Sequence, residues 1–402
     1  MEDISLQAKI DVLTEQQVLI QDSAVAFVEG DEELKRVRAN RFVQPGFDRA
    51  SWSEMAEAGW LGFVVPEEYG GVGLTFSDLA LVLIQLGKGL VPAPFVATAV
   101  LAARTLAGSD NAPLRAERLP QLVVGDWLPA LAWQEARASL DVKARRVVYA
   151  NGKLSGRKVF VPDAGGADAF IVSAAVPDGT ALYLVDKDAP GLSLEFEQRV
   201  DGGFYGHLSF VDTPVGAQVA GPERSEALLA TVLDEGRVAA SAELLGVMTR
   251  ALEISVDYLK QRVQFDKPIG SFQALPAQDR RSVHPERFPA RCCCRPRRCS
   301  DGEADATQRA VAASQVKARC SDAALRIGKD AIQLHGGIGY TDECNIGLYL
   351  KKAMYLASWL GSASAHRARY ADLTLGGGAM TNTMDYNART TATSAIWSTT
   401  GW

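Results

Sequence analysis

The run Gln333-Leu-His-Gly-Gly-Ile-Gly-Tyr-Thr-Asp-Glu343 is the most informative stretch of this sequence. It ends a helical pattern with paired glycines, where the backbone can approach a phosphate closely, and then presents one carboxylate. A second run, Arg262-Val-Gln-Phe-Asp-Lys-Pro-Ile-Gly-Ser-Phe-Gln273, precedes it in the chain. The second run places a guanidinium and an aromatic ring at a helix end, and these groups suit a pyrophosphate and a flat ring.

Length and composition describe an ordinary globular protein. The chain has 402 residues, of which 47% are hydrophobic, and a formal net charge of -6. This length predicts two or three domains, because single cores stop growing beyond about 250–300 residues. The mild acidity argues against nucleic acid as the main partner. No apolar run reaches the roughly 18 residues of a membrane span, and Met1-Glu-Asp-Ile does not resemble a signal peptide. We therefore expect a cytoplasmic protein.

The hydrophobic pattern changes twice along the chain. Residues 1–125 show apolar residues at three- and four-residue steps, which predicts an N-terminal helical domain. Residues 126–220 contain short β-branched runs bounded by Gly, Asp, Asn or Pro, which predicts a small antiparallel β domain. Helical patterns return over 221–375. The remainder, 376–402, is rich in Thr, Ser, Asn and Gly and predicts a disordered tail.

Residues 276–300 contradict their surroundings. Seven arginines, four prolines and four cysteines fall in this segment without a helical or strand period. Proline costs about 3 kcal/mol inside a helix. We hypothesise a frame slip, since Asp279–Glu286 can be encoded so that reading one nucleotide on gives Ile-Val-Asp-Leu-Phe-Ile-Gln, which restores a helical pattern. The consecutive thiols Cys292, Cys293 and Cys294 cannot converge on one tetrahedral metal, so we expect no metal site.

In their order and separation, the two runs resemble the C-terminal domain of the acyl-CoA dehydrogenases, which are FAD-dependent flavoproteins. The succession of helices, sheet and helices is also similar to that family, over about residues 5–375. The resemblance implies an α+β fold with an N-terminal helical domain, a middle antiparallel β-barrel-like domain and a C-terminal four-helix bundle. It also implies an acyl-CoA substrate and an electron-transferring flavoprotein as electron acceptor. The implied oligomer is a homotetramer, or a heterotetramer with a second dehydrogenase subunit.

The resemblance assigns FAD-binding residues in three groups. The residues that would hold FAD from the adjacent subunit are Arg262, Gln264, Phe265, Phe272 and Gln273. Those that would lie along the pyrophosphate and adenosine are Gln333, Gly336 and Gly337. Those that would provide hydroxyl contacts near the flavin are Ser362 and Ser364.

The middle domain departs from the family pattern. Relatives carry Thr-Glu-x-x-x-Gly-Ser-Asp against the flavin and the substrate sulfur, whereas this chain has Gln134-Glu-Ala-Arg-Ala-Ser-Leu-Asp141, with Ser139 in place of the glycine. The Trp-Ile-Thr that follows in relatives is Phe160-Val-Pro162 here. Phe160 can still cover a flat ring, whereas Pro162 offers neither a hydroxyl nor an N–H. Such changes are similar to those in small or auxiliary subunits, among them dicarboxyl-CoA-type enzymes.

Glu343 matches the family's catalytic base by its place after Gly-Gly-x-Gly-aromatic. A base of this kind is shielded, so that its pKa rises toward the working pH, and we therefore expect Glu343 in a cavity sealed from water. The place of Glu343 in the sequence is also consistent with a solvent-exposed glutamate just before the next helix. Some relatives place the base immediately before an arginine, but here Gly236 precedes Arg237 and cannot serve. Arg237 either orients the site or lies on a helix surface.

The resemblance implies a dehydrogenase that forms a trans-2,3-enoyl-CoA. Glu343 would remove the α-proton while the β-hydrogen leaves as a hydride to flavin N5. The alternative is an auxiliary, weakly catalytic or non-catalytic subunit of a heteromeric acyl-CoA dehydrogenase, which the altered middle domain favours. A third possibility is other chemistry on the same scaffold, such as oxidation of a nitroalkane or removal of a leaving group from an acyl chain. Nitroalkane oxidation would use an aspartate as base, and Asp342 is one residue out of place for it.

Overall fold

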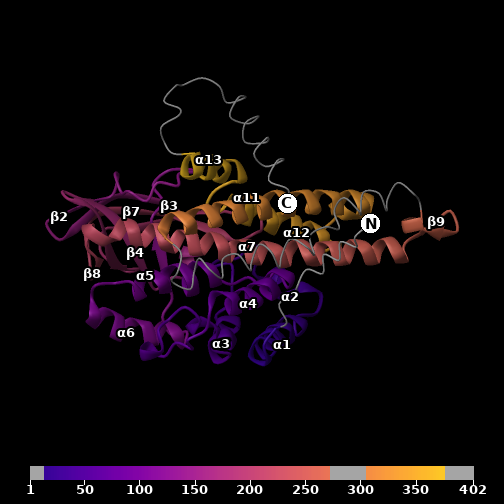
Figure 1. The fold of residues 1–402 in the computed structure, drawn as a ribbon, viewed down its shortest axis with the longest axis horizontal. Helices are drawn as coiled ribbons and strands as arrows, with labels where there is room; N and C mark the ends of the chain where they lie inside the picture. Colours follow the sequence, from indigo (N-terminus) through magenta and orange to yellow (C-terminus); the bar gives the residue numbers. More distant parts are fainter. Residues whose placement is uncertain (1–12, 272–304, 376–402) are drawn as a thin grey trace, which may run out of the picture.

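The computed structural model describes residues 13–271 and 305–375 (Figure 1). Phe272, Gln273, the segment 276–300 and the tail 376–402 lie outside these ranges. Within the described ranges, no helix combines the length and apolar character that crossing a membrane requires.

The first part of the chain is helical. A π-helical segment, Phe95–Ala102, is buried along its whole length. Thr75 and Asp78 form a capping box at the start of the helix Phe76–Lys88. The Thr75 side chain accepts a hydrogen bond from the Asp78 N–H, and the Asp78 carboxylate accepts one from the Thr75 N–H. The helices are α1 Glu15–Glu29, α2 Lys35–Asn40, α3 Arg49–Glu57, α4 Phe76–Lys88, α5 Ala103–Ala107 and α6 Ala112–Val123.

An eight-stranded sheet follows, in the order β6-β7-β3-β2-β4-β5-β8 with β1 beside β4. Most pairs are antiparallel, but β1 and β2 both pair with β4 in parallel. The expectation of a purely antiparallel domain is therefore wrong for β1 and β2. The chain enters β1 from α6 and not through a hairpin, so no hairpin forces β1 to run antiparallel to β4. The strands are β1 Pro129–Ala132, β2 Val148–Ala150, β3 Lys153–Pro162, β4 Ala169–Val176, β5 Gly179–Asp186, β6 Leu192–Gln198, β7 Phe204–Pro214 and β8 Ala217–Ala220.

The third part is built on α7 (Pro222–Gln261), a helix of 40 residues. At 1.5 Å per residue, α7 is about 60 Å long. A short hairpin of β9 (Val263–Gln264) and β10 (Lys267–Pro268) follows at its end. Helix α11 (Ala306–His335) lies along α7 and runs in the same direction, as shown by the Arg309–Thr231 hydrogen bond near the start of both helices and the stacked Tyr258 and His335 rings near their ends. Helices α12 (Ile346–Ser358) and α13 (Ala363–Leu375) complete the described part.

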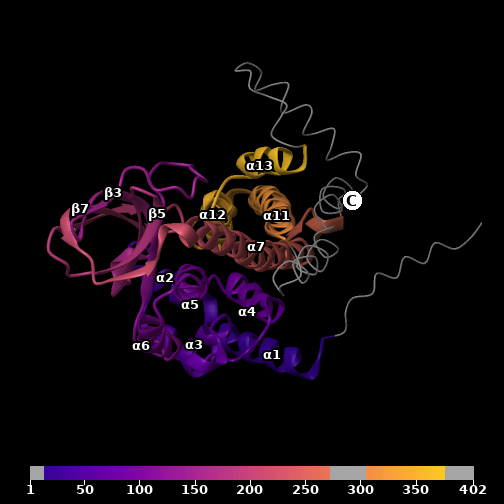
Figure 2. The same cartoon turned by 60° about the vertical axis from the view of Figure 1, so that its left-hand side comes forward.

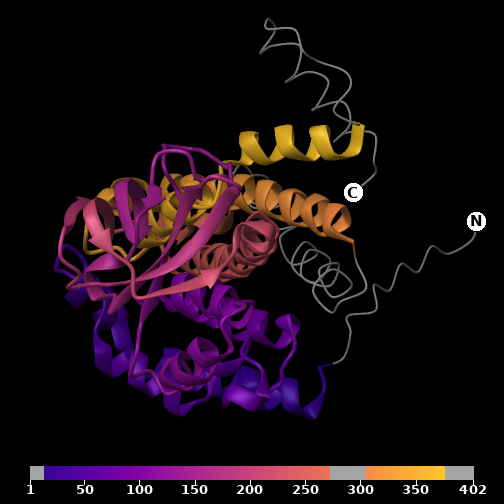
Figure 3. The same cartoon turned by 90° about the vertical axis from the view of Figure 1, so that its left-hand side faces the viewer.

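The parts pack as layers around α7. Figure 2 shows the N-terminal helices on one side of α7, α11 and α12 on the other, and α13 outermost. Figure 3, viewed from the sheet end, shows the same succession. Because the described elements change type between Val123 and Pro129 and between Ala220 and Pro222, we propose domain limits near residues 125 and 221.

Two glycines let α4 and α7 approach closely. A Cβ at Gly246 of α7 would lie 1.9 Å from the carbonyl oxygen of Ile84. A Cβ at Gly87 of α4 would lie 2.1 Å from the carbonyl oxygen of Glu243. Both contacts are with backbone, which cannot yield as a flexible side chain can, so this crossing requires glycine at both positions.

A buried lysine joins α11 to the end of α12. The Lys317 side chain is fully buried, and its Nζ donates hydrogen bonds to the carbonyl oxygens of Leu356, Ala357 and Gly361 at 2.8, 3.1 and 3.1 Å. Burial lowers the pKa of Lys317 to about 7. These bonds satisfy carbonyls that the end of a helix leaves without partners.

We expect Lys317→Met to destabilise the protein by about 3 kcal/mol, because it leaves buried carbonyl oxygens without donors. Urea unfolding of the purified variant measures the loss. The matched control, Lys329→Met, replaces an exposed lysine of the same helix and should change stability by no more than about 0.5 kcal/mol. Equal effects of the two substitutions would contradict the capping role.

Candidate functional site

The FAD-contacting residues expected from the sequence lie in two places. We call them the hairpin group (Arg262, Gln264, Phe265, Gln333, Gly336 and Gly337) and the sheet group (Gln134, Ser139, Phe160, Ser362 and Ser364). The hairpin group lies beside β9, at the opposite end of the molecule from the strands (Figure 1). About 38 Å of α7 separates Arg262 from Arg237, which contacts the loop before Ser362. One dinucleotide cannot touch both groups of a single chain.

The hairpin group is open to solvent. Arg262, Gln264 and Phe265 are exposed, Phe265 with 85% of its surface. Gly336 has φ 62°, a left-handed conformation that favours glycine. A Cβ at Gly336 or Gly337 would have no described atom within 4 Å. Open backbone beside an arginine is a surface that a phosphate can approach, so these residues fit part of an FAD site.

The sheet group is occupied by the chain's own side chains. The Phe160 ring lies edge-to-face against Tyr205 and His207, with centroid separations of 5.6 and 5.1 Å. The Arg137 guanidinium lies over the same ring at 5.2 Å. Gln134 donates its amide to the Ala136 carbonyl oxygen instead of pointing outward. The ring expected to cover a flavin is therefore already covered in part.

The remaining members of the sheet group are less constrained. Ser362 and Ser364 are exposed and lie within 3.0 Å of each other through their hydroxyl oxygens. The Ser139 hydroxyl accepts a hydrogen bond from the Asp141 N–H. These hydroxyls lie near each other in the fold, since a Cβ at Gly361 would touch the Leu140 side chain.

Glu135, which follows Gln134 in the chain, has a structural role. Its carboxylate accepts hydrogen bonds from the N–H groups of Arg145, Arg146 and Val147, and from Lys158 Nζ at 2.7 Å. Burial lowers the pKa of Lys158 to about 8, and the Glu135 charge opposes that shift. Glu135 thus anchors the loop that leads into β2.

Glu343 is exposed and lies before the first residue of α12. The expectation that it lies in a cavity sealed from water is wrong for the single chain. The physical reason is the direction of α12: Glu343 precedes this helix and Ser362 follows it, so about 20 Å of helix separates Glu343 from the sheet group. Glu343 and Phe160 cannot face one flavin within one chain.

The neighbouring Asp342 is held by arginines of α2. Arg41 forms hydrogen bonds and an ion pair with the Asp342 carboxylate, and Arg38 donates to the Asp342 carbonyl oxygen at 3.0 Å. The hydrogen bond from Arg41 lowers the pKa of Asp342 to about 2. Asp342 is thus a weak base, which disfavours nitroalkane oxidation.

Arg237 is buried, with 2% of its surface exposed, so the surface alternative for this residue is wrong. Its Nη1 donates to Asp234 Oδ1 at 2.6 Å and its Nε to the Leu360 carbonyl oxygen at 3.2 Å. Burial lowers its pKa to about 10. Arg237 positions the loop between α12 and α13.

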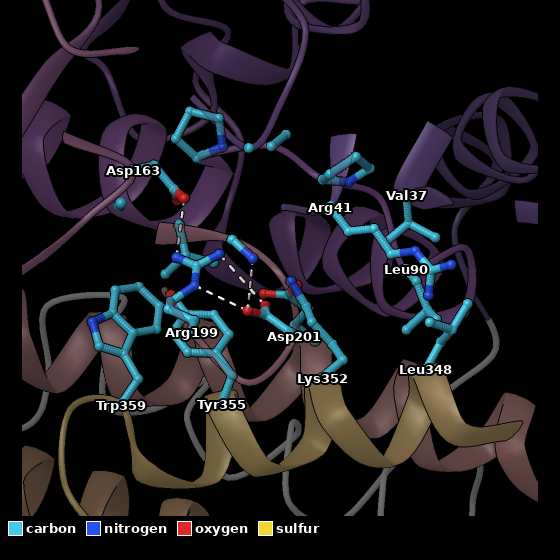
Figure 4. Close-up of a pocket in the computed structure, with 18 residues that line it drawn as sticks. Val37, Arg41, Leu90, Asp163, Arg199, Asp201, Leu348, Lys352, Tyr355 and Trp359 are labelled. Carbon is cyan, nitrogen blue, oxygen red and sulfur yellow. Dashed lines mark hydrogen bonds and ion pairs between the residues drawn. The ribbon is translucent and has the colours of Figure 1, made fainter. Parts of the chain in front are cut away.

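A cavity lies between the N-terminal helices, the sheet and α12 (Figure 4). Leu90 and Pro92 line it on the side of α4, and Tyr355 and Trp359 line it on the side of α12. The space open to the centre of a water molecule is about 40 Å³. One water needs about 10–15 Å³ by this measure, so the cavity holds only a few waters.

Each acidic side chain that lines the cavity is paired. Asp163 and Asp201 both contact Arg199, at 3.0 and 3.1 Å, and Glu243 contacts Lys352 at 2.7 Å. Among the described lining residues there is therefore no free carboxylate. Sequence analysis missed Arg199: Arg199-Val-Asp-Gly-Gly203 is a pattern typical of an exposed turn, and only the packing buries it.

Within residues 13–271 and 305–375, His, Cys, Asp and Glu form no cluster of three that could hold a metal ion.

Comparison with known proteins agrees with this architecture. Models described as acyl-CoA dehydrogenase N-terminal domain and C-terminal domain match residues 14–126 and 227–373. An acyl-CoA dehydrogenase of Bacillus subtilis is 30% identical over 81% of this chain and 89% of its own. The Tcur3481–Tcur3483 steroid ACAD is similar in structure, with TM-score 0.80 and 33% identity over 91% of this chain and 99% of that one. The ChsE4–ChsE5 complex from Mycobacterium tuberculosis is also similar, with TM-score 0.77 and 25% identity over 89% and 96%.

We expect Arg41→Ala to loosen the loop 341–345, because it removes the charged partner that holds Asp342. Hydrogen–deuterium exchange of the purified protein should show about tenfold faster exchange in this loop. Arg145→Ala is the control, since it removes a similar exposed pair with Asp141 elsewhere. Unchanged exchange in the loop would show that Arg38 alone suffices.

Proposed function

Because the chain belongs to the acyl-CoA dehydrogenase family, whose members are FAD-binding oxidoreductases, we propose that it is one of two unlike subunits of a heteromeric acyl-CoA dehydrogenase. The observation that carries the proposal is the absence of a free carboxylate among the described residues that line the cavity. A base for α-proton removal must be unpaired and shielded. Glu343 is unshielded, so the partner subunit supplies the base.

The hairpin group is this chain's proposed contribution to the cofactor site. When bound, FAD accepts the hydride that leaves the β-carbon of the acyl thioester. Arg262 would donate two hydrogen bonds to the pyrophosphate, and Phe265 would pack against a flat ring. Gly336 and Gly337 would let the backbone approach the phosphates. Since this group lies far from the chain's own sheet, the FAD that it contacts is held mainly by a neighbouring subunit.

Two similar structures support an assembly of unlike chains, since each carries the names of two proteins. The altered sheet group supports it as well, because Arg137 covers Phe160. As the family resemblance implies, such an assembly would use an electron-transferring flavoprotein as its electron acceptor.

A second candidate is a self-sufficient dehydrogenase, a homotetramer with Glu343 as the base. One observation favours it: the loop of Glu343 is fixed by Arg38 and Arg41, and its exposed side chain could be covered by a neighbouring copy. In that case Glu343 would take the α-proton, and the product would be a trans-2,3-enoyl-CoA.

Anaerobic titration with a panel of acyl-CoAs separates the two candidates. We expect the chain expressed alone to purify with little FAD, and a complex with a co-expressed dehydrogenase subunit to be yellow. Glu343→Gln in that complex should bleach at the wild-type rate, as should the control Glu68→Gln, another exposed glutamate. A chain that is yellow alone, and whose bleaching falls at least about 100-fold in Glu343→Gln, would establish Glu343 as the base.

Arg262→Ala should weaken FAD retention by the complex about 10- to 100-fold, since it removes a charge-assisted contact of about 1.5–3 kcal/mol. Fluorescence of released flavin on dilution measures this loss. Lys260→Ala is the control, because it removes an exposed positive charge two residues away. Equal losses in both variants would show that general charge, and not a specific contact, retains the cofactor.

A further inference from the structure

We propose that Arg199, Asp163 and Asp201 form a permanent plug in the cavity beside α12, so that this chain accepts no acyl group there. The inference rests on the proposed function and extends it: acyl-CoA is bound only in the partner's cavity, with one acyl site for each pair of unlike chains.

All three residues of the plug line the cavity. Figure 4 shows Arg199 between Asp163 and Asp201, above the side chains that α12 presents. Its guanidinium lies 4.0 Å from the centre of the Tyr355 ring and 5.6 Å from that of Tyr205. The Arg199 side chain is 8% exposed and those of its two carboxylate partners 11% and 9%. The Arg199 guanidinium is therefore held by two carboxylates at its edges and by the Tyr355 ring against its face.

The backbone around Arg199 is built to hold it in this place. The Arg199 N–H donates to the Gly203 carbonyl oxygen at 2.8 Å, and the Gly203 N–H donates to Asp201 Oδ1 at 3.2 Å. A Cβ at Gly203 would lie 2.1 Å from Arg199 Nη2, so glycine makes room for the guanidinium. Gly202 adopts φ 92°, which the tight turn requires. This turn therefore holds the Arg199 side chain in one conformation.

Opening the plug would be costly. Moving Arg199 away would remove the ion-pair partner of the buried Asp163 and Asp201, and breaking a buried ion pair is strongly destabilising. An acyl chain offers these carboxylates no hydrogen bond in return. Lys352 cannot take over, because it is already paired with Glu243 at 2.7 Å. The cluster thus excludes an apolar guest by charge as well as by volume.

The test is photolabelling of the wild-type complex with octanoyl-CoA that carries a diazirine on its acyl chain. We expect labelled peptides from the partner subunit and none from residues 348–359 of this chain. Labelling of that stretch in the wild type would overturn the plug. This measurement does not depend on the folding of any variant.

A charge-balanced variant provides the complementary test. Arg199→Ala, Asp163→Asn and Asp201→Asn together remove the plug without leaving unpaired carboxylates. We expect calorimetry with octanoyl-CoA to rise from one to two sites per pair of chains, with new labelling at residues 348–359. A folded variant that gains no site would contradict the plug. The control Arg157→Ala with Glu195→Gln removes an exposed ion pair of the same sheet and should keep one site.

The two proposals can fail separately. If Glu343→Gln abolishes bleaching, the partner-subunit function fails whatever the labelling shows. If residues 348–359 of the wild type are labelled while Glu343→Gln bleaches normally, only the plug fails.

Discussion

The close crossing of α4 and α7 is the constraint on which the rest of the structure depends. Gly87 and Gly246 bring two helix backbones together where any Cβ would collide with a carbonyl. This contact sets the N-terminal helices against the long α7, whose length then places the sheet at one end and the β9–β10 hairpin at the other. The cavity forms where the N-terminal helices, the sheet and α12 meet.

The length of α7 also decides how the chain can use a cofactor. Arg262 and Phe160 lie too far apart to contact one FAD, so each cofactor site is shared between chains if both groups are used. In this chain the two halves are unequal. The hairpin group is open to a ligand, whereas Arg137 covers part of the Phe160 ring and the paired Arg199 lines the small cavity beside α12. This asymmetry is what a subunit specialised for one half of a shared site would show.

Much of the architecture could be predicted from the sequence. The periodicities predicted helices over 221–375, where α7 and α11 lie, and the family resemblance is confirmed by the matches to both helical domains. Two features were not predicted. The parallel pairing of β1 and β2 with β4 depends on the path of the chain between strands, and the periodicity of a strand gives no information about that path. Arg237 looked equally like a surface residue, and only its contact with the Leu360 carbonyl shows that it positions a loop.

The sequence by itself determined the kinds of elements, their order and the residues available for chemistry, because these follow from local periodicity and from motifs of a few residues. Only the tertiary structure decided which of those residues can act. Asp163 and Arg199 are 36 positions apart, and they pair in the wall of the cavity. Glu343 keeps its motif but lies in solvent, at the other end of α12 from the sheet group. Burial and ion pairing arise from contacts between distant segments, and a linear pattern does not contain them.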